Sequence, residues 1–144
     1  MLIDTKYFGR MEIKDEQVIS FPGGIPAFEH IREFALIPLP GSDLYFCLQS
    51  TKEPDTAFLL VKPWDFFPEY DIVLPDEDLK ELSIHSREQT NLYNILTLGG
   101  NTGEVTANLL APIVINVKTC LGKQVILPGE AYGTKHTLFK KERA

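Results

Sequence analysis

A mainly β fold in a single domain is predicted from three features of the sequence. Its apolar residues come in short runs rich in β-branched and aromatic side chains. Turn residues separate these runs at roughly 8–12-residue spacing, which is typical of antiparallel sandwiches and barrels. The chain has 144 residues, enough for one hydrophobic core. We therefore expect a single compact antiparallel β-barrel-like domain with one or two short helices.

The apolar runs predict strands at the following positions: 2–8, 10–14, 17–21, 34–39, 44–50, 56–62, 70–74, 92–98, 104–110, 112–118 and 123–127. Two stretches favour helix. In 27–34 three apolar residues recur at three-residue spacing, which allows a turn or two. In 75–82 a proline and acidic residues stand at the start, and Leu79 and Leu82 supply an apolar side.

Charge divides the chain into two parts. We assign residues 1–133 to the barrel domain and residues 134–144 to a basic, flexible C-terminal tail. The tail carries four basic residues and one acidic residue, a net +3, so the remainder of the −6 chain carries −9. An acidic body repels phosphate, which disfavours direct binding of nucleic acid, and it attracts a basic protein.

The sequence also indicates a cytoplasmic protein without membrane contact. No apolar run approaches the roughly 18–20 residues that span a bilayer, and an acidic residue at position 4 replaces the basic region of a secretory signal. Cys47 and Cys120 both lie in apolar runs. Two such cysteines behave as small hydrophobic residues and form no disulfide framework.

No motif for covalent chemistry is found. His30, His85 and His136 are far apart in sequence, and no Cys/His pair has the spacing of zinc ligands. The serines lie outside any nucleophile elbow. Carboxylates are plentiful, so the sequence leaves a catalytic pair open, but it singles none out. We therefore expect no metal and no cofactor, and the residues alone give no support to enzymatic activity.

The most unusual segment is PWDFFPEYDIVLPDEDL, residues 63–79, which has six acidic residues and no basic one between aromatic residues. In one interpretation the aromatic rings belong to the core and the acids solvate a loop and a helix start. In the other, the rings anchor a protein partner and the acids steer a basic one. On that hypothesis the contact residues are Asp65, Phe66, Phe67, Glu69, Asp71, Asp76, Glu77 and Asp78.

A second irregular stretch is TANLLAPIVIN, residues 106–116. Pro112 cannot donate to a central ladder, so it predicts a bulge, a strand end or an edge. Asn108 and Asn116 can bond the backbone groups that such a break leaves unpaired. Thr106, Leu109 and Ile113 would then pack inward. We favour an architectural role, although an edge opened at Pro112 could instead accept a partner strand.

Together with GKQVIL (122–127), TANLLAPIVIN resembles the signature of the flagellar assembly factor FliW family. FPGGIPAFE (21–29), LQS (48–50) and FLLVKPWDFFPEYD (58–71) resemble further family motifs, in the expected order and spacing. The resemblance runs from about Tyr7 to Tyr132, so nothing is carried over to the tail. Each motif is weak alone, and their combination is specific.

The resemblance implies a β-barrel-like monomer without enzymatic activity and with two protein partners. One is flagellin in the cytoplasm. The other is CsrA, a small basic homodimer that binds messenger RNA and blocks flagellin translation. FliW-like proteins relieve this block by binding CsrA away from its RNA surface. Flagellin competes for FliW, so accumulated flagellin frees CsrA and stops its own synthesis.

Two alternatives from other classes remain open at this stage. One is a small β-barrel ligand-binding protein or enzyme that uses its interior or mouth. The other is a nucleic-acid binder of OB type, in which Trp64, Phe66 and Phe67 stack on bases.

Overall fold

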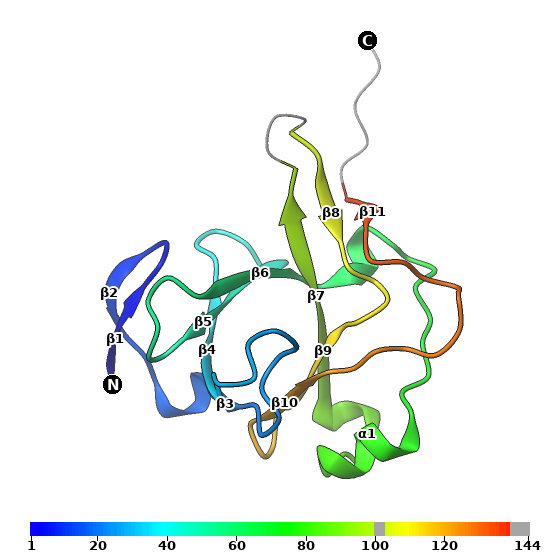
Figure 1. Ribbon diagram of the computed structural model, residues 1–144, viewed down its shortest axis with the longest axis horizontal. Coiled ribbons are helices and arrows are strands. Elements are labelled where there is room, and N and C mark those ends of the chain that lie inside the picture. The colour runs from blue at the N-terminus through cyan, green and yellow to red at the C-terminus, as the bar shows by residue number, and fades with distance from the viewer. Residues whose placement is uncertain (100–102, 139–144) are drawn as a thin grey trace.

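The computed structural model describes residues 1–99 and 103–138, and it is mainly β (Figure 1). The strands are β1 Leu2–Thr5, β2 Gly9–Glu12, β3 Val18–Ser20, β4 Glu33–Pro38, β5 Tyr45–Ser50, β6 Ala57–Val61, β7 Thr90–Leu98, β8 Val105–Ala107, β9 Ile113–Asn116, β10 Leu121–Gln124 and β11 His136–Thr137. The helices are α1 Asp76–Glu81 and three 3₁₀ turns, η1 Asp15–Gln17, η2 Pro63–Asp65 and η3 Arg87–Gln89.

Seven of these strands close a barrel, which confirms the predicted fold class. The order is β7-β6-β5-β4-β3-β10-β9, and β9 returns to pair with β7. One pairing departs from the antiparallel pattern, because β10 joins β3 in parallel through Leu121 and Ser20. β8 and β11 extend the sheet beyond the barrel beside the end of β7, and β1 and β2 form a separate hairpin (Figure 1).

The barrel interior is filled with side chains. Every second residue of the strands points inward and joins one buried cluster: Ile19, Phe34, Leu48, Leu60, Tyr93, Ile113 and Ile115. Phe21, Ile25 and Ile31, from the loop between β3 and β4, belong to the same cluster. The loop therefore plugs the barrel (Figure 1), and this packing gives no support to a ligand site in the interior.

Two further clusters lie on the outside of the barrel. One holds Ile3 and Ile13 of the N-terminal hairpin region against Ala35, Ile37 and Cys47 of β4 and β5. The other covers the outer side of β7 and β9 with the segment that follows β6 and with the C-terminal part of the chain. It includes Tyr70, Leu82, Leu92, Val114 and Leu138. This second cluster fixes the position of the acidic segment.

Two predicted elements are wrong. Residues 27–34 form no helix, because Ala27 has φ +72° and Phe34 lies in β4. The turn before it is tight: Gly24 has φ +68°, and a Cβ there would lie 2.5 Å from Glu29 Cα. Residues 70–74 form no strand. The predicted helix at 75–82 is confirmed as α1.

The predicted boundary between domain and tail also needs correction. β11 pairs with β8, with His136 opposite Ala107 and Thr137 opposite Thr106, and Leu138 is buried. The ordered domain therefore continues to Leu138, because these residues complete the outer cluster. The rest of the predicted tail, 139–144, lies outside the described residues.

In the part of the chain that the structure describes, no helix has both the length and the apolar character needed to cross a membrane.

Candidate functional site

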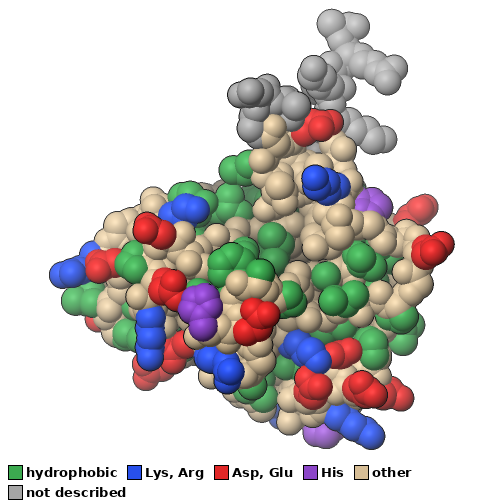
Figure 2. Space-filling model, viewed as in Figure 1, with side chains coloured by type: hydrophobic (Ala, Val, Ile, Leu, Met, Phe, Trp, Pro, Cys, Tyr) green, Lys and Arg blue, Asp and Glu red, His purple; other side chains and the backbone are tan. Residues whose placement is uncertain are grey.

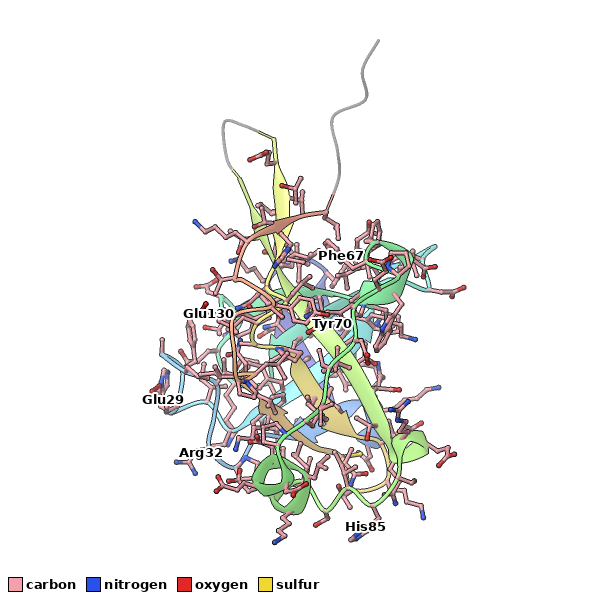
Figure 3. All side chains as sticks on the ribbon, turned by 90° about the vertical axis from the view of Figure 1, so that its right-hand side faces the viewer. Glu29, Arg32, Phe67, Tyr70, His85 and Glu130 are labelled. Atoms are coloured by element: carbon pink, nitrogen blue, oxygen red, sulfur yellow. The ribbon has the colours of Figure 1, made fainter. Side chains whose placement is uncertain are left out.

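The 63–79 segment runs along the outside of the barrel, from η2 past Tyr70 to α1 (Figure 3). Pro63 ends the β6 ladder and starts η2, where the Phe66 and Phe67 amides donate to the Pro63 carbonyl at 3.0 and 2.8 Å. Beyond this turn the chain leaves the sheet. It returns to the sheet only at β7, so the whole acidic segment lies on the surface of the second outer cluster.

Tyr70 attaches the segment to the barrel. Its ring is buried, and its hydroxyl donates to the Leu109 carbonyl at 2.7 Å and accepts from Asn94 Nδ2 at 3.4 Å. Trp64 Nε1 donates to the Tyr70 carbonyl at 2.9 Å. Burial raises the pKa of Tyr70 to about 12, against a smaller opposing effect of the Asn94 bond. Tyr70 is therefore a neutral structural anchor at physiological pH.

The neighbouring rings divide between core and surface. Phe66 and Phe67 are half-buried and pack against the outer cluster, whereas Trp64 is 47% exposed. Of the three rings that an OB-type binder would stack on bases, only Trp64 is exposed. The structure thus provides no platform of neighbouring exposed rings at this site. Phe66 and Phe67 each keep part of their surface exposed, and their contact with a protein partner stays a prediction.

The acidic side chains form an exposed set with one exception. Asp65, Glu69, Asp71, Asp76 and Glu77 are all exposed. Asp78 is different, because its carboxylate lies 2.6 Å from Lys123 Nζ and its side chain is 14% exposed.

Lys123 also pairs with Glu81, at 2.6 Å, and the bonds to the two carboxylates raise the pKa of Lys123. Asp78 is therefore a structural residue that ties α1 to β10. The exposed negative charge comes from the other five acidic residues of the predicted set. Acidic side chains gather over α1, with basic ones among them (Figure 2).

The two asparagines of the 106–116 stretch bond different backbone groups. Asn108 bonds at the break between β8 and β9, whereas Asn116, at the end of β9, bonds the segments that follow α1 and β9. Asn108 Oδ1 accepts from the Ala111 amide at 2.9 Å, and the Asn108 carbonyl accepts from Asn94 Nδ2 at 2.8 Å. Asn116 is fully buried, and its Nδ2 donates to the Leu82 and Ser83 carbonyls at 2.7 and 3.2 Å. Asn116 Oδ1 accepts from the amides of the loop that follows β9, at 2.9 and 3.3 Å.

Pro112 lies directly before β9 and is buried. Its carbonyl accepts from the Val125 amide at 2.9 Å, and the Leu110 carbonyl accepts from Leu127 at 2.9 Å. The edge at Pro112 is thus covered by the chain itself, which disfavours the docking of a partner strand there. Leu109 and Ile113 are buried, whereas Thr106 is half-exposed and its neighbour Ala107 is the buried residue.

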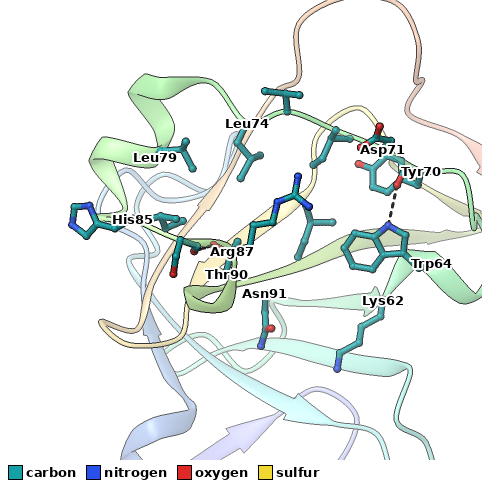
Figure 4. A pocket seen from close by; sticks show the side chains of 15 residues that line it. Lys62, Trp64, Tyr70, Asp71, Leu74, Leu79, His85, Arg87, Thr90 and Asn91 are labelled. Carbon is teal, nitrogen blue, oxygen red and sulfur yellow. Dashed lines mark hydrogen bonds between the residues drawn. The ribbon is translucent and has the colours of Figure 1, made fainter.

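Sequence reasoning missed a groove of about 740 Å³ between β7 and residues 70–74 (Figure 4). Leu74, Leu79 and Leu92 line it, Trp64 lies at one end, and Arg87 projects into it. No local sequence signal could have indicated this groove. It exists because residues 70–74 stand away from β7, and that separation is a tertiary feature.

The structure offers little chemistry elsewhere. Cys47 of β5 is buried against β4 and the N-terminal hairpin region. Burial raises its pKa to about 11, so this thiol stays protonated at neutral pH. Within residues 1–99 and 103–138, no group of three or more His, Cys, Asp or Glu side chains could hold a metal ion.

Comparison with known proteins agrees with this architecture. The family model described as FliW protein matches residues 2–138. The flagellar assembly factor FliW of Geobacillus thermodenitrificans is 44% identical over 144 residues, covering 100% of this chain and 99% of that protein. The flagellar assembly factor FliW of Anoxybacillus flavithermus is 43% identical over 139 residues, covering 96% of this chain and 95% of that protein.

A solved structure, described as the crystal structure of the flagellar assembly factor FliW, superposes with a TM-score of 0.89. Its sequence identity is 43%, and the match covers 97% of this chain and 98% of that chain. The similarity therefore extends through the barrel, the 63–79 segment and the 106–116 stretch. On the strength of this agreement in sequence and fold, the chain belongs to the FliW family of flagellar assembly factors.

Proposed function

We propose that this protein acts in flagellar assembly by binding two competing protein partners, CsrA and flagellin, in the cytoplasm, and that it catalyses no reaction. The observation that carries this proposal is the exposed acidic set on the 63–79 segment. Five carboxylates project there from a segment that Tyr70 and the outer cluster hold in place. A fixed surface of negative charge suits a basic partner, since complementary charge speeds encounter and fixes orientation.

Competition between the two partners requires only mass action. CsrA bound to this protein cannot repress flagellin messenger RNA, and flagellin bound to this protein leaves CsrA free to do so. The tighter complex at the prevailing concentrations determines the outcome. Rising flagellin thereby restores repression, and its secretion removes repression again.

The acidic surface also provides a physical means of releasing RNA. Bound next to CsrA, the carboxylates lower the positive potential near the RNA-binding groove and weaken its hold on phosphate without occupying it. Such an effect between exposed charges is screened over about 8 Å at physiological ionic strength. It must therefore be stronger at low salt.

The test is an RNA-release titration with CsrA, comparing wild type with the double variant Asp76→Asn/Glu77→Gln. Both residues are exposed in α1, and none of the described residues pairs with either of them. We expect the variant to release RNA less effectively, with a larger deficit at 50 mM than at 300 mM salt, the direction required by screening. A deficit independent of salt would contradict the electrostatic mechanism.

Lys52→Gln provides the control for a change of surface charge, since Lys52 is exposed in the turn after β5 and outside the acidic segment. Its RNA release should match wild type. Calorimetric titration with CsrA and with flagellin, each repeated in the presence of the other, tests the competition. Simultaneous binding without loss of affinity would refute the partner switch.

A further inference from the structure

Residues 72–74 have the form of a strand without a partner. Their side chains alternate: Ile72 and Leu74 pack on the outer cluster, whereas Val73 is 84% exposed. Across the described residues, no hydrogen bond reaches the backbone N–H or C=O of Ile72, Val73 or Leu74. Unpaired, extended backbone with an exposed aliphatic side chain is the usual template for an added strand.

The facing part of β7 also has an open edge. The Gln89 carbonyl accepts from Val117 at 2.8 Å and the Ile95 carbonyl from Asn108 at 2.9 Å, so the odd-numbered residues face β9 and β8. Because antiparallel bonds alternate, the N–H and C=O of Leu92 face the opposite way. There β6 has ended: Val61 pairs with Asn94, and Pro63 has no N–H with which to continue.

The charges in the groove select an acidic occupant. Arg87 is exposed and projects between Leu74 and Trp64 (Figure 4). No carboxylate or other acceptor among the described side chains bonds to its guanidinium. Lys62 also lines the groove, and its Nζ lies 5.3 Å from the centre of the Phe46 ring. Asp71 is the only acid in the lining, so this site is locally positive on a chain of net charge −6.

We propose that the groove binds an extended segment of a protein partner that carries an aliphatic side chain and a carboxylate. The segment pairs its backbone with the open edges at residues 72–74 and Leu92. Its aliphatic side chain lies against Leu74 and Leu79, and its carboxylate accepts from Arg87. The groove volume of about 740 Å³ is in the usual range for binding sites, roughly 300–1,000 Å³.

This proposal does not depend on CsrA binding. The acidic set attracts a basic partner, whereas the groove, which shares only Asp71 with that set, takes an acidic segment. A protein with both sites can therefore hold chemically different partners on adjacent surfaces.

The experiment selects ligands from a library of random octapeptides on the whole protein. The best peptide is then titrated while the fluorescence of Trp64, the only tryptophan, is recorded. We expect enriched peptides to alternate aliphatic and polar residues and to contain Glu or Asp, and binding to shift the Trp64 emission. Arg87→Glu should weaken binding by more than about tenfold, because the peptide carboxylate loses one charge-assisted hydrogen bond.

Two matched comparisons make the result specific. Replacing the peptide's acidic residue with lysine should restore binding to the Arg87→Glu variant, and Lys52→Glu, with the same change in charge outside the groove, should bind as wild type. N-methylation of the peptide backbone should abolish pairing with the open edges. Selection of no peptide, or affinity unaffected by both Arg87→Glu and N-methylation, would overturn the proposal.

Discussion

Two stretches of this chain depart from their sequence patterns in opposite directions. Residues 106–116 have a sequence that should disrupt a strand, with two asparagines and an Ala-Pro pair, yet hydrogen bonds satisfy the backbone at the break, residues 108–112. Residues 70–74 read as a regular strand, yet no described residue bonds to the backbone of 72–74. The stretch with the irregular sequence therefore has a paired backbone, and the stretch with the regular sequence has an unpaired one.

The difference follows from where each stretch lies. The 106–116 stretch crosses from β8 to β9 over the outer cluster, and any unpaired group there would be buried without water, at a cost of roughly 1–3 kcal/mol. Side chains of Asn94, Asn108 and Tyr70 supply bonds at this break. Residues 72–74 lie at the surface, beyond the buried ring of Tyr70, and water can solvate their open backbone groups.

The comparison shows which irregularity concerns architecture and which concerns binding. A broken strand whose backbone N–H and C=O groups all bond within the protein has none left to bond a partner. A strand pattern at the surface with unpaired N–H and C=O groups can bond one. The predictions below test this distinction, beginning with the largest expected effect.

Asn116→Ala should lower the free energy of unfolding by about 2–4 kcal/mol, because the side chain is fully buried and its loss leaves two carbonyls and two amides, one of the carbonyls in a buried bond, without their partner. Urea denaturation at pH 7 measures this loss. The neighbouring exposed residue provides the control: Thr119→Ala should change stability by less than about 0.5 kcal/mol. Equal effects for the two variants would mean that the bonds of Asn116 contribute little to the stability of the 106–116 stretch.

Tyr70→Phe should cost about 1–2 kcal/mol at pH 7, since the Leu109 carbonyl loses its donor. It should also change the response to alkali. The pKa of Tyr70 is raised to about 12 in the folded protein, against about 10 when unfolded, so the folded state holds this proton more tightly. The resulting stability is fully present below pH 10 and is lost as the pH rises through 12.

Denaturation between pH 9 and pH 11.5 should therefore show a smaller decline for Tyr70→Phe than for wild type. An identical decline would mean that Tyr70 ionises as easily in the folded protein as in the unfolded chain.

Val73→Thr should have the smallest effect, a change of less than about 0.5 kcal/mol by the same denaturation assay, because the side chain is 84% exposed and its backbone has no bonds to lose. A loss above 1 kcal/mol would show that residues 72–74 contribute to the fold, and the contrast between the two regions would fail.

Much of the fold could be predicted from the sequence, because most of its strands and helices have local causes. Alternating apolar residues predicted ten of the strands now seen, with ends that differ by a few residues. The proline and acids at 75–78 predicted the start of α1. For the candidate site, the composition of 63–79 indicated an acidic surface, and Asn108 and Asn116 indicated local backbone bonding.

The failures share one cause, which is that pairing depends on a distant partner. YDIVL has the pattern of a strand, but a strand forms only when another edge lies within hydrogen-bonding distance, and β6 turns away at Pro63. AFEHIREF has helical spacing, but Ala27 takes a left-handed conformation and Phe34 joins β4, because the loop must fill the barrel. Asp78 belongs to the acidic run by composition, yet Lys123, far along the chain, makes it a structural residue.

By itself, then, the sequence determined the β class, the turns, the acidic surface and the bond of Asn108 to the nearby Ala111 amide, since each depends on neighbours a few residues away. Only the tertiary structure decided the closure of the barrel, the parallel contact of β3 with β10, the docking of β11 and the groove beside β7. Each of these depends on how segments far apart in sequence are placed relative to one another. Local sequence patterns do not determine that placement.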